Sequence, residues 1–262
     1  MSSPDFFYEK RLWKSGYKFI AGTDEVGRGC FAGPVVAAAV VLRPQISKSL
    51  SAQAGKFQIP KEIRINDSKK LTPEQRGISA KWIKKNALAY GIGSISAKVI
   101  NRIGMAKATQ MAFRKAIASA NKRFEQTYTS SIQFLLIDAF FIPFVKGFPR
   151  GSRYIKGNGK IKSPKAKQLA IINGDEKSIS IAAASIIAKV YRDKLMQKIG
   201  SRARYKKYKW YKNKGYATKE HTVAILKYRI TGYHRKKFVE TYLSNSSLSN
   251  SFLSNFSFSQ VL

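Results

Sequence analysis

The sequence predicts a mixed-sheet α/β domain. Two apolar segments within the first 42 residues are predicted to be strands joined by a Gly-rich turn, and later strands alternate with helices. The chain has 262 residues, 44% of them hydrophobic, which is enough to bury a core of its own. We therefore expect an ordered, enzyme-sized body, because a disordered basic tail would lack such a core.

Five segments have the composition of strands. One of them is continuously apolar, which is typical of a strand whose two faces are both covered. Another is weakened by glycines, and a third ends directly at Asp138. The predicted strands are residues 19–24, 35–42, 88–96, 132–137 and 169–172.

Three helices are indicated by caps and periodicity. Thr72 and Gln75 form a capping box around a first-turn proline, so a helix is predicted to begin there and to run to about residue 86. Residues 105–124 repeat apolar side chains at helical spacing. Residues 176–199 carry the clearest apolar stripe and are followed by a glycine.

The charge balance requires a polyanionic partner. Lys and Arg number 49 against 14 Asp and Glu, which gives a formal net charge of +35. We expect phosphate contacts to dominate affinity, so binding should fall steeply as salt rises. The candidates for these contacts are Lys69, Lys70, Lys189, Arg192, Lys212 and Lys214.

The rarity of Cys and His limits the metal chemistry. Cys30 is the single cysteine, so an intrachain disulfide and a cysteine-rich zinc cluster are excluded. His221 and His234 are the two histidines, too few for a histidine-built site. No apolar stretch approaches the roughly 20 residues of a bilayer span, and residues 1–18 lack the apolar core of a signal peptide. We expect a cytoplasmic protein with no membrane partner.

Four carboxylates occur where strands are predicted to end. Asp24 and Glu25 lie at the end of the first strand, Asp138 ends a central strand, and Asp175 follows a third. Ligands of open α/β sheets collect at the carboxyl ends of strands, and converging anions need a cation among them. Oxygen ligands favour Mg²⁺ or Mn²⁺.

Each acid also has an ordinary structural explanation. Asp175 precedes a helix and can serve as its N-cap, and Asp138 can end a strand at the surface. Asp24 and Glu25 are adjacent, so an extended strand would point them to opposite faces unless the backbone turns there. The following Gly27-Arg28-Gly29 permits such a turn.

Several segments resemble the ribonuclease HII family, in the family's order. They are GTDEVGRGCFAGPVVAAAVVL from residue 22, NDSKKLT from 66, LLIDAF from 135, GDEKSISIAAASIIAKVYRD from 174, NKGYATKEHTVAI from 213 and HRKKF from 234. The resemblance covers roughly residues 19–240. It implies the ribonuclease H-like fold, with a five-stranded mixed sheet, flanking helices and a helical C-terminal extension.

The resemblance also implies an activity and a domain arrangement. The family hydrolyses the RNA strand of RNA–DNA hybrids and cuts 5′ of single ribonucleotides embedded in duplex DNA. The implied regions are an N-terminal segment, a catalytic domain, a helical substrate-binding region and a Ser/Asn-rich tail that we expect to be disordered. Their expected ranges are 1–18, 19–199, 200–242 and 243–262.

Site residues follow by position in the matching motifs. The family's metal-binding acids correspond to Asp24, Glu25, Asp138 and Asp175, with Mg²⁺ or Mn²⁺ as cofactor. The loop that recognises the 2′-hydroxyl corresponds to Gly27, Arg28 and Gly29, and the tyrosine that stacks on the next sugar corresponds to Tyr216. The NDSKKLT segment is expected to contribute Asn66, Ser68 and Lys69 to substrate binding.

The sequence departs from the family pattern at a few positions. Cys30 stands where proline is usual, Lys237 where serine is common, and Asn173 where lysine is frequent. The segments at residues 43–64 and 146–167 are longer than a minimal family member has. None of these changes removes one of the four acids.

Two other classes of function stay open at this point. A ribosomal-type RNA-binding protein or an inactive family member would share the positive charge, but a binder has no need of four acids at strand ends. Within enzymes the alternative is the related ribonuclease HIII, which prefers longer RNA stretches. The sequence indicates no protein partner, and we expect a monomer.

Overall fold

The computed structural model describes residues 3–44, 58–148 and 167–245. The chain divides into two compact units. The sheet unit comprises Met1–Val26, Val36–Gly93 and Gln110–Val190, and the C-terminal unit comprises Gly27–Val35, Ser94–Thr109 and Tyr191–Leu262. This division differs from the expected boundary at residue 199, because the C-terminal unit takes in two earlier segments and the last turns of a long helix.

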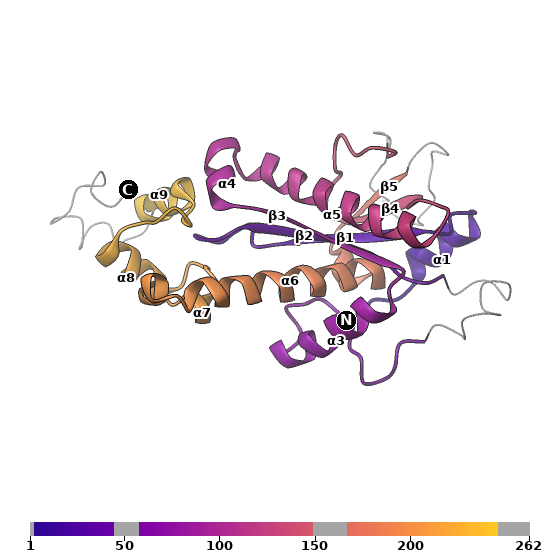
Figure 1. The fold of residues 1–262 in the computed structure, drawn as a ribbon, viewed down its shortest axis with the longest axis horizontal. Coiled ribbons are helices and arrows are strands. Elements are labelled where there is room, and N and C mark those ends of the chain that lie inside the picture. The colour runs from indigo at the N-terminus through magenta and orange to yellow at the C-terminus, as the bar shows by residue number, and fades with distance from the viewer. Residues whose placement is uncertain (1–2, 45–57, 149–166, 246–262) are drawn as a thin grey trace. The chain divides into compact units, whose positions relative to one another are not determined.

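The sheet is mixed and five-stranded, as expected. Its order is β3-β2-β1-β4-β5, with β1 antiparallel to β2 and parallel to β4, and β4 parallel to β5 (Figure 1). The strands are β1 (Ile20–Val26), β2 (Val35–Val41), β3 (Ala89–Ile95), β4 (Phe134–Asp138) and β5 (Gln168–Ile171). Each predicted strand is present with shifts of one or two residues at its ends.

The helices confirm the predicted ones and add others. The capping box is present, since Thr72 Oγ1 accepts the Gln75 N–H (3.2 Å) and Gln75 Oε1 accepts the Thr72 N–H (3.0 Å). The helices are α1 (Phe7–Lys14), α3 (Pro73–Asn86), α4 (Ala97–Ile103), α5 (Met105–Thr127), α6 (Ile179–Gly200), α7 (Trp210–Asn213), α8 (Lys219–Tyr228) and α9 (Lys236–Asn245). Two 3₁₀ helices span Gly174–Glu176 and Ala203–Tyr208.

Parts of two sequence expectations fall outside the described residues. Most of the segments at 43–64 and 146–167 lie there, as does the expected tail from residue 246 onward. The expected tail boundary at residue 243 is too early, because α9 continues to Asn245 and buries Leu243.

Glycines bring two helices close to the strands of the sheet unit. In Figure 1, α5 lies over one side of the sheet and α6 over the other. A Cβ at Gly93 of β3 would lie 2.0 Å from the Ala112 carbonyl oxygen of α5, and one at Gly22 of β1 would lie 2.0 Å from the Ser180 carbonyl carbon of α6. The glycines that weaken β3 as a strand therefore serve helix packing.

The contact at Gly22 gives a stability prediction. Gly22→Ala should lower the free energy of unfolding by about 3 kcal/mol or more, because the added methyl meets the backbone of α6 rather than a movable side chain. Urea unfolding of the variant, compared with Gly29→Ala, measures this effect. A Cβ at Gly29 meets no atom within 4 Å, so that control should unfold close to wild type. Equal midpoints for the two variants would show that β1 and α6 are not in this contact.

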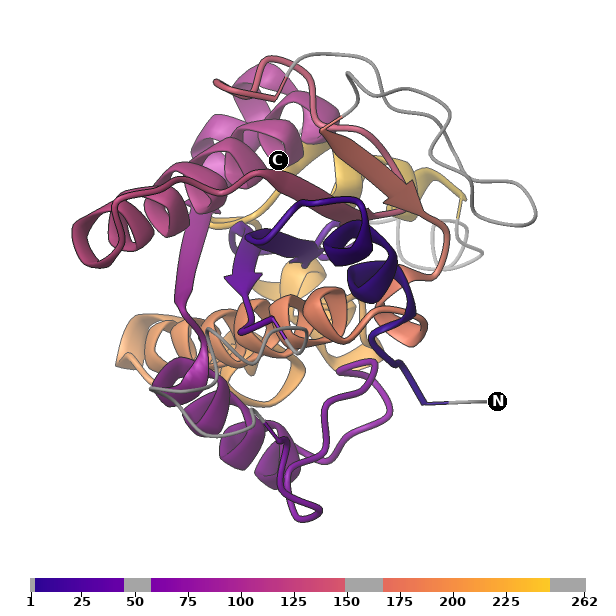
Figure 2. The same ribbon diagram turned by 90° about the vertical axis from the view of Figure 1, so that its right-hand side faces the viewer.

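Helix α1 docks on the start of α6 through a buried carboxylate. Glu9 is 0% exposed, and its Oε1 accepts the Ser178 hydroxyl (2.6 Å) and the Ser180 N–H (3.0 Å). Burial raises the pKa of Glu9. Figure 2 shows α1, in indigo, on the side of the sheet unit that faces the viewer. Sequence patterning gave no helix here, because eight residues are too few for a clear period.

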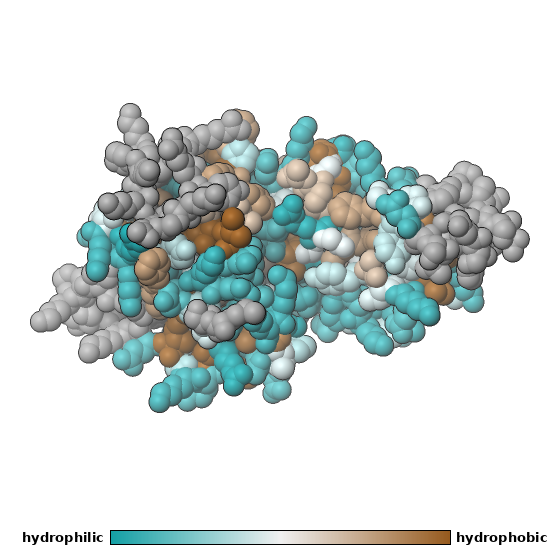
Figure 3. Space-filling model, turned by 180° about the vertical axis from the view of Figure 1, so that it is seen from behind, coloured by the Kyte–Doolittle hydropathy of each residue, from teal (hydrophilic) through white to brown (hydrophobic). Residues whose placement is uncertain are grey.

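The described surface agrees with the basic composition. In Figure 3 most visible residues are hydrophilic, with smaller hydrophobic areas between them. Among the residues that the structure describes, no helix is both long and apolar enough to cross a membrane.

Candidate metal and substrate sites

Three of the four predicted acids lie at the carboxyl ends of neighbouring parallel strands. Asp24 and Asp138 directly follow the paired residues Thr23 and Ile137 of β1 and β4. Asp138 pairs with Ile171, the last residue of β5, and Asp175 follows in the first 3₁₀ helix. The topology therefore places these three carboxyl groups at one edge of the sheet unit, as the strand-end argument predicted.

Asp24 is buried among other carboxylates. It is 6% exposed, and burial together with the charges of Glu25 and Asp138 raises its pKa well above the usual value. A side-chain hydrogen bond with Ser185 of α6 opposes this rise. Asp24 Oδ1 also accepts the Glu25 N–H at 2.7 Å. The carboxylate is thus oriented by donors while it carries an unfavourable negative charge.

Asp175 has a second acid beside it. Burial, followed by the charges of Asp138 and Asp67, raises its pKa to about 6, and Lys69 lowers it. The Asp67 side chain is close enough to Asp175 to contribute to this rise in pKa. Lys69 Nζ lies 3.9 Å from Asp175 Oδ2 and 4.0 Å from Asp67 Oδ1.

Asp175 does not cap α6. Ser178 takes that place, because its hydroxyl accepts the Ile181 N–H at 3.2 Å. The structural alternative for Asp175 is therefore wrong. The alternative for Asp138 is also weakened, since Asp138 Oδ1 accepts the Gly174 N–H at 2.7 Å and points toward the segment that carries Asp175.

Glu25 differs from the sequence expectation. Strand β1 stays paired to β2 through Val26, so the chain does not turn between Asp24 and Glu25. The expected turn begins at Gly27, where φ is +89°. Successive residues of a strand start toward opposite faces, yet Glu25 is close enough to Asp24 for its charge to raise the pKa of that carboxyl group.

The acids fit a divalent cation by chemistry and by charge. Their oxygens are the hard donors that Mg²⁺ and Mn²⁺ prefer, and their mutual repulsion is relieved by a positive ion. Among the described residues, however, no three His, Cys, Asp or Glu side chains already stand in an arrangement ready to hold an ion.

The NDSKKLT segment lies beside these acids. Asn66 Oδ1 accepts the Asp67 N–H at 2.8 Å, so the amide shapes the turn. Ser68 is 4% exposed, and its hydroxyl accepts a hydrogen bond from the Ser185 hydroxyl at 3.0 Å. Since Ser185 also bonds Asp24, Ser68 helps to hold Ser185 in place beside that carboxylate. Asp67 was missed from the sequence because it lies in a loop. It was nevertheless the single acid of a motif already singled out.

The Gly27-Arg28-Gly29 loop belongs to the C-terminal unit. Gly27 is buried, whereas Arg28 and Gly29 are exposed. Phe31 N–H and Ala32 N–H both donate to the Gly215 carbonyl, at 2.9 and 3.2 Å. The loop therefore rests on the segment that carries Tyr216.

Two buried histidines, His221 and His234, contact each other, and His221 also bonds the backbone of Tyr216. His221 Nδ1 donates to the Tyr216 carbonyl (2.9 Å), and His221 Nε2 lies 2.9 Å from Trp210 Nε1 and 3.2 Å from His234 Nε2. Thr231 N–H donates to His234 Nδ1 at 2.8 Å, so the single proton of His234 lies on Nε2. His221 is 0% exposed, which fits a structural role in this pair.

These histidines predict loss of stability in acid. Burial lowers the pKa of His221 to about 4, and burial and the His221 neighbour lower that of His234 to about 3. Between pH 6.5, the usual histidine pKa, and these lowered values, the two histidines bind protons in the unfolded chain but stay neutral in the folded chain. The free energy of unfolding should fall by about 1.4 kcal/mol per pH unit for each histidine until those folded values are reached.

Urea midpoints between pH 7 and pH 4 for wild type and His234→Gln measure this effect. The variant should show the shallower pH slope, while buried carboxyl groups affect both proteins equally. Parallel slopes would show that His234 is not held neutral in the folded chain.

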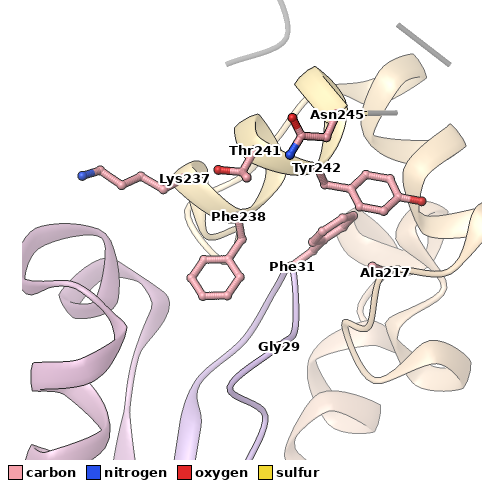
Figure 4. Close-up of a pocket in the computed structure, with 8 residues that line it drawn as sticks. All are labelled: Gly29, Phe31, Ala217, Lys237, Phe238, Thr241, Tyr242 and Asn245. Atoms are coloured by element: carbon pink, nitrogen blue, oxygen red, sulfur yellow. The ribbon is translucent and has the colours of Figure 1, made fainter. Parts of the chain in front are cut away.

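An aromatic pocket opens beside Gly29. Its volume is about 650 Å³, and Phe31, Phe238 and Tyr242 present their rings to it (Figure 4). Ala217, Thr241 and Asn245 complete the lining, and Lys237 extends away from the rings. The exposed glycine of the loop thus faces a hollow with flat apolar walls.

One candidate phosphate contact is wrong. Arg192 is 0% exposed and donates to backbone carbonyls, so it cannot reach a phosphate at the surface. Other candidates have protein partners but stay at the surface. Lys70 lies 2.6 Å from Glu176, and Lys212 lies 3.7 Å from Glu220.

Comparison with known proteins decides the family. A family model described as Ribonuclease HII matches residues 21–241. The chain belongs to the ribonuclease HII family. The ribonuclease HII of Caldanaerobacter subterraneus subsp. tengcongensis is 42% identical over 240 residues, which cover 90% of this chain and 80% of the relative. The ribonuclease HII of Wolbachia pipientis subsp. Culex pipiens is 40% identical over 238 residues, covering 91% and 97%.

Solved structures confirm the ribonuclease H-like fold. Ribonuclease H2 from Pyrococcus horikoshii superposes with a TM-score of 0.54 at 20% identity, over 87% of this chain and all of that one. Ribonuclease HII of Archaeoglobus fulgidus, solved in a complex with PCNA, gives 0.53 at 23% identity, over 83% and 93% of the two chains. Bst-RNase HIII with Mn²⁺ gives 0.55 at 18% identity, over 91% and 70%. The ribonuclease HII assignment rests on the sequence relatives, and ribonuclease HIII has no better support.

Proposed function

We propose that this type 2 ribonuclease H hydrolyses the RNA strand of RNA–DNA hybrids and nicks 5′ of single ribonucleotides in duplex DNA. The observation that carries the proposal is the set of Asp24, Asp138 and Asp175 at the ends of parallel strands, where carboxylates raise one another's pKa. A non-catalytic binder has no use for such a costly arrangement of negative charge in a chain with net charge +35.

The acids have distinct places in this proposal. Asp24 and Asp138 are the ligands that we expect to be indispensable, and Glu25 and Asp175 complete the set for Mg²⁺ or Mn²⁺. When bound, such ions lower the pKa of a water molecule and stabilise the leaving 3′-oxygen. The protein orients the carboxylates, through Ser185 at Asp24 and the Gly174 N–H at Asp138.

Lys69 supplies a movable positive charge next to Asp175. Its side chain is 81% exposed, although its amine lies within 4.0 Å of both Asp67 and Asp175. We infer that the amine balances these acids before substrate arrives and can then contact a phosphate of the nucleic acid. Lys69 would thus exchange its carboxylate partners for a phosphate, because an exposed ion pair contributes little free energy and is easily broken.

Selection of RNA depends on the exposed loop and on Tyr216. Backbone groups of Gly27, Arg28 and Gly29 that bond the 2′-hydroxyl would be left unpaired against DNA, which favours the ribonucleotide strongly. Tyr216 is half-buried, and its ring presents an apolar face suited to a deoxyribose. We retain a cytoplasmic monomer as part of the proposal.

A paired cleavage assay tests the proposed function. Wild type should nick a DNA duplex carrying one ribonucleotide, leaving 3′-hydroxyl and 5′-phosphate ends, when Mg²⁺ or Mn²⁺ is present and not in excess chelator. It should also cut an all-RNA hybrid, whereas preference for the hybrid alone would favour a ribonuclease HIII-like activity. Asp138→Asn, run on both substrates, should fail on each. A variant that cuts as fast as wild type would show that Asp138 is not a ligand.

A further inference from the structure

Arg192 is buried in the C-terminal unit, although its charge suggested a surface role. It lies in the last part of α6 and is 0% exposed. Its Nε donates to the Pro34 carbonyl (3.0 Å) and its Nη2 to the Ala32 carbonyl (3.1 Å). A fully buried guanidinium is rare, and here three of its donor groups go to backbone carbonyls.

The same side chain reaches the segment of Tyr216. Nη1 donates to the Lys214 carbonyl at 3.0 Å, and the Arg192 Cζ lies 5.5 Å from the centre of the Tyr216 ring. That distance is typical of a cation–π contact. One guanidinium therefore joins two segments that are far apart in the sequence.

Arg192 also defines the start of the recognition loop. A Cβ at Gly27 would lie 2.2 Å from Arg192 Nε, so the glycine backbone packs directly on the guanidinium. Gly27 has a φ of +89°, which a side chain would strain in any case. The loop begins at this contact and returns to Arg192 at Ala32 and Pro34.

A second buried arginine, Arg235, holds the middle of the loop. Arg235 Nε donates to the Gly33 carbonyl (3.0 Å) and its Nη1 to the Arg28 carbonyl (2.8 Å). The described hydrogen bonds of Arg235 involve the loop rather than the 214–216 segment. The two arginines thus differ in their described hydrogen bonds, because Arg192 also donates to the Lys214 carbonyl in the segment of Tyr216.

We propose that Arg192 is a positioning residue that fixes the Gly27–Gly29 loop relative to the Tyr216 ring and thereby sets the preference for a ribonucleotide. The inference rests on the proposed role of this loop and of Tyr216 in substrate recognition. A 2′-hydroxyl donor and the next sugar are a fixed distance apart, so the two protein elements must be spaced to match. Lysine cannot replace Arg192, because a single ammonium on a flexible stem cannot serve three carbonyls and a ring in fork geometry.

The test compares two substrates that differ in one group. Both are DNA duplexes with one modified nucleotide, which carries a 2′-hydroxyl in one and a 2′-fluoro group in the other. Wild type should cut the 2′-hydroxyl duplex at least about a hundredfold faster in kcat/KM. If wild type cuts neither duplex, the proposed function fails and the positioning role fails with it. If it cuts both equally, the role of the loop fails.

R192K then tests Arg192 itself. The ratio of the two kcat/KM values should shrink at least about tenfold in R192K. A general loss of active enzyme would lower both values equally and leave the ratio unchanged, so a smaller ratio reports weaker discrimination between the two substrates. Arg204→Lys is the matched control, since Arg204 is exposed and its Cζ lies 5.7 Å from the Tyr205 ring. The control should keep the wild-type ratio. A wild-type ratio in R192K would overturn the positioning role.

Hydrogen exchange on wild type gives a second measurement in case R192K does not fold. The amides of Phe31 and Ala32 in the loop and of Tyr216 should open with the same free energy, because one guanidinium joins the two segments. Clearly different opening free energies for the two segments would overturn the proposal.

Discussion

Asp24→Asn should reduce cleavage of a ribonucleotide-containing duplex by at least about a thousandfold while the protein becomes no less stable. The loss follows because asparagine keeps the shape of the side chain and removes the negative charge that a cation requires. Stability is expected to hold or rise, because the pKa of Asp24 is raised by burial and by Glu25 and Asp138. A raised pKa means that the ionised form is penalised in the folded chain at neutral pH, so a neutral side chain removes the penalty.

The measurement combines single-turnover cleavage with thermal unfolding in chelator at pH 7.5. Glu74→Gln is the matched control, because Glu74 is an exposed acid in the first turn of α3. This control should cleave at the wild-type rate. A large drop in the melting temperature of Asp24→Asn would mean that the carboxylate is structural, and normal cleavage would remove it from the site.

Gly29→Ala and Gly27→Ala should fail for different reasons. A Cβ at Gly29 projects into open space, so the variant should unfold within about 0.5 kcal/mol of wild type and yet cleave at least about a hundredfold more slowly. At Gly27 the φ of +89° and the contact with Arg192 add strain and a clash, so that variant should lose about 2 kcal/mol or more of stability.

Urea unfolding and steady-state cleavage of the two variants separate these effects. Full activity of Gly29→Ala would show that the exposed part of the loop does not meet the substrate. Wild-type stability of Gly27→Ala would contradict the close packing of the loop on Arg192.

Local chemistry predicted much of the fold. The Thr72 and Gln75 capping box appears where the sequence placed it, because both hydrogen bonds are formed within one turn of the chain. The five strands could be predicted from their apolar runs, because a sheet covered by helices on both sides buries both faces of its strands. Helix α1 was missed because its docking depends on Glu9 reaching Ser178 and Ser180, which are distant in the sequence.

In the site, too, the residues that depend on local sequence were predicted, and those that depend on tertiary packing were not. Strand ends identified Asp24, Asp138 and Asp175, since parallel strands bring their carboxyl ends to one edge. Asp67 comes from a loop, so the strand-end rule passed over it. Arg192 was assigned to a phosphate on charge alone, and charge does not report that a side chain is 0% exposed.

Calorimetric titration of the protein with Mn²⁺ in the absence of nucleic acid tests the central claim most directly. Wild type should bind the ion saturably, and the binding should be lost in Asp24→Asn and in Asp138→Asn but kept in Glu74→Gln. Binding that is unchanged in both aspartate variants would place the cation elsewhere and would contradict the assignment of these carboxylates.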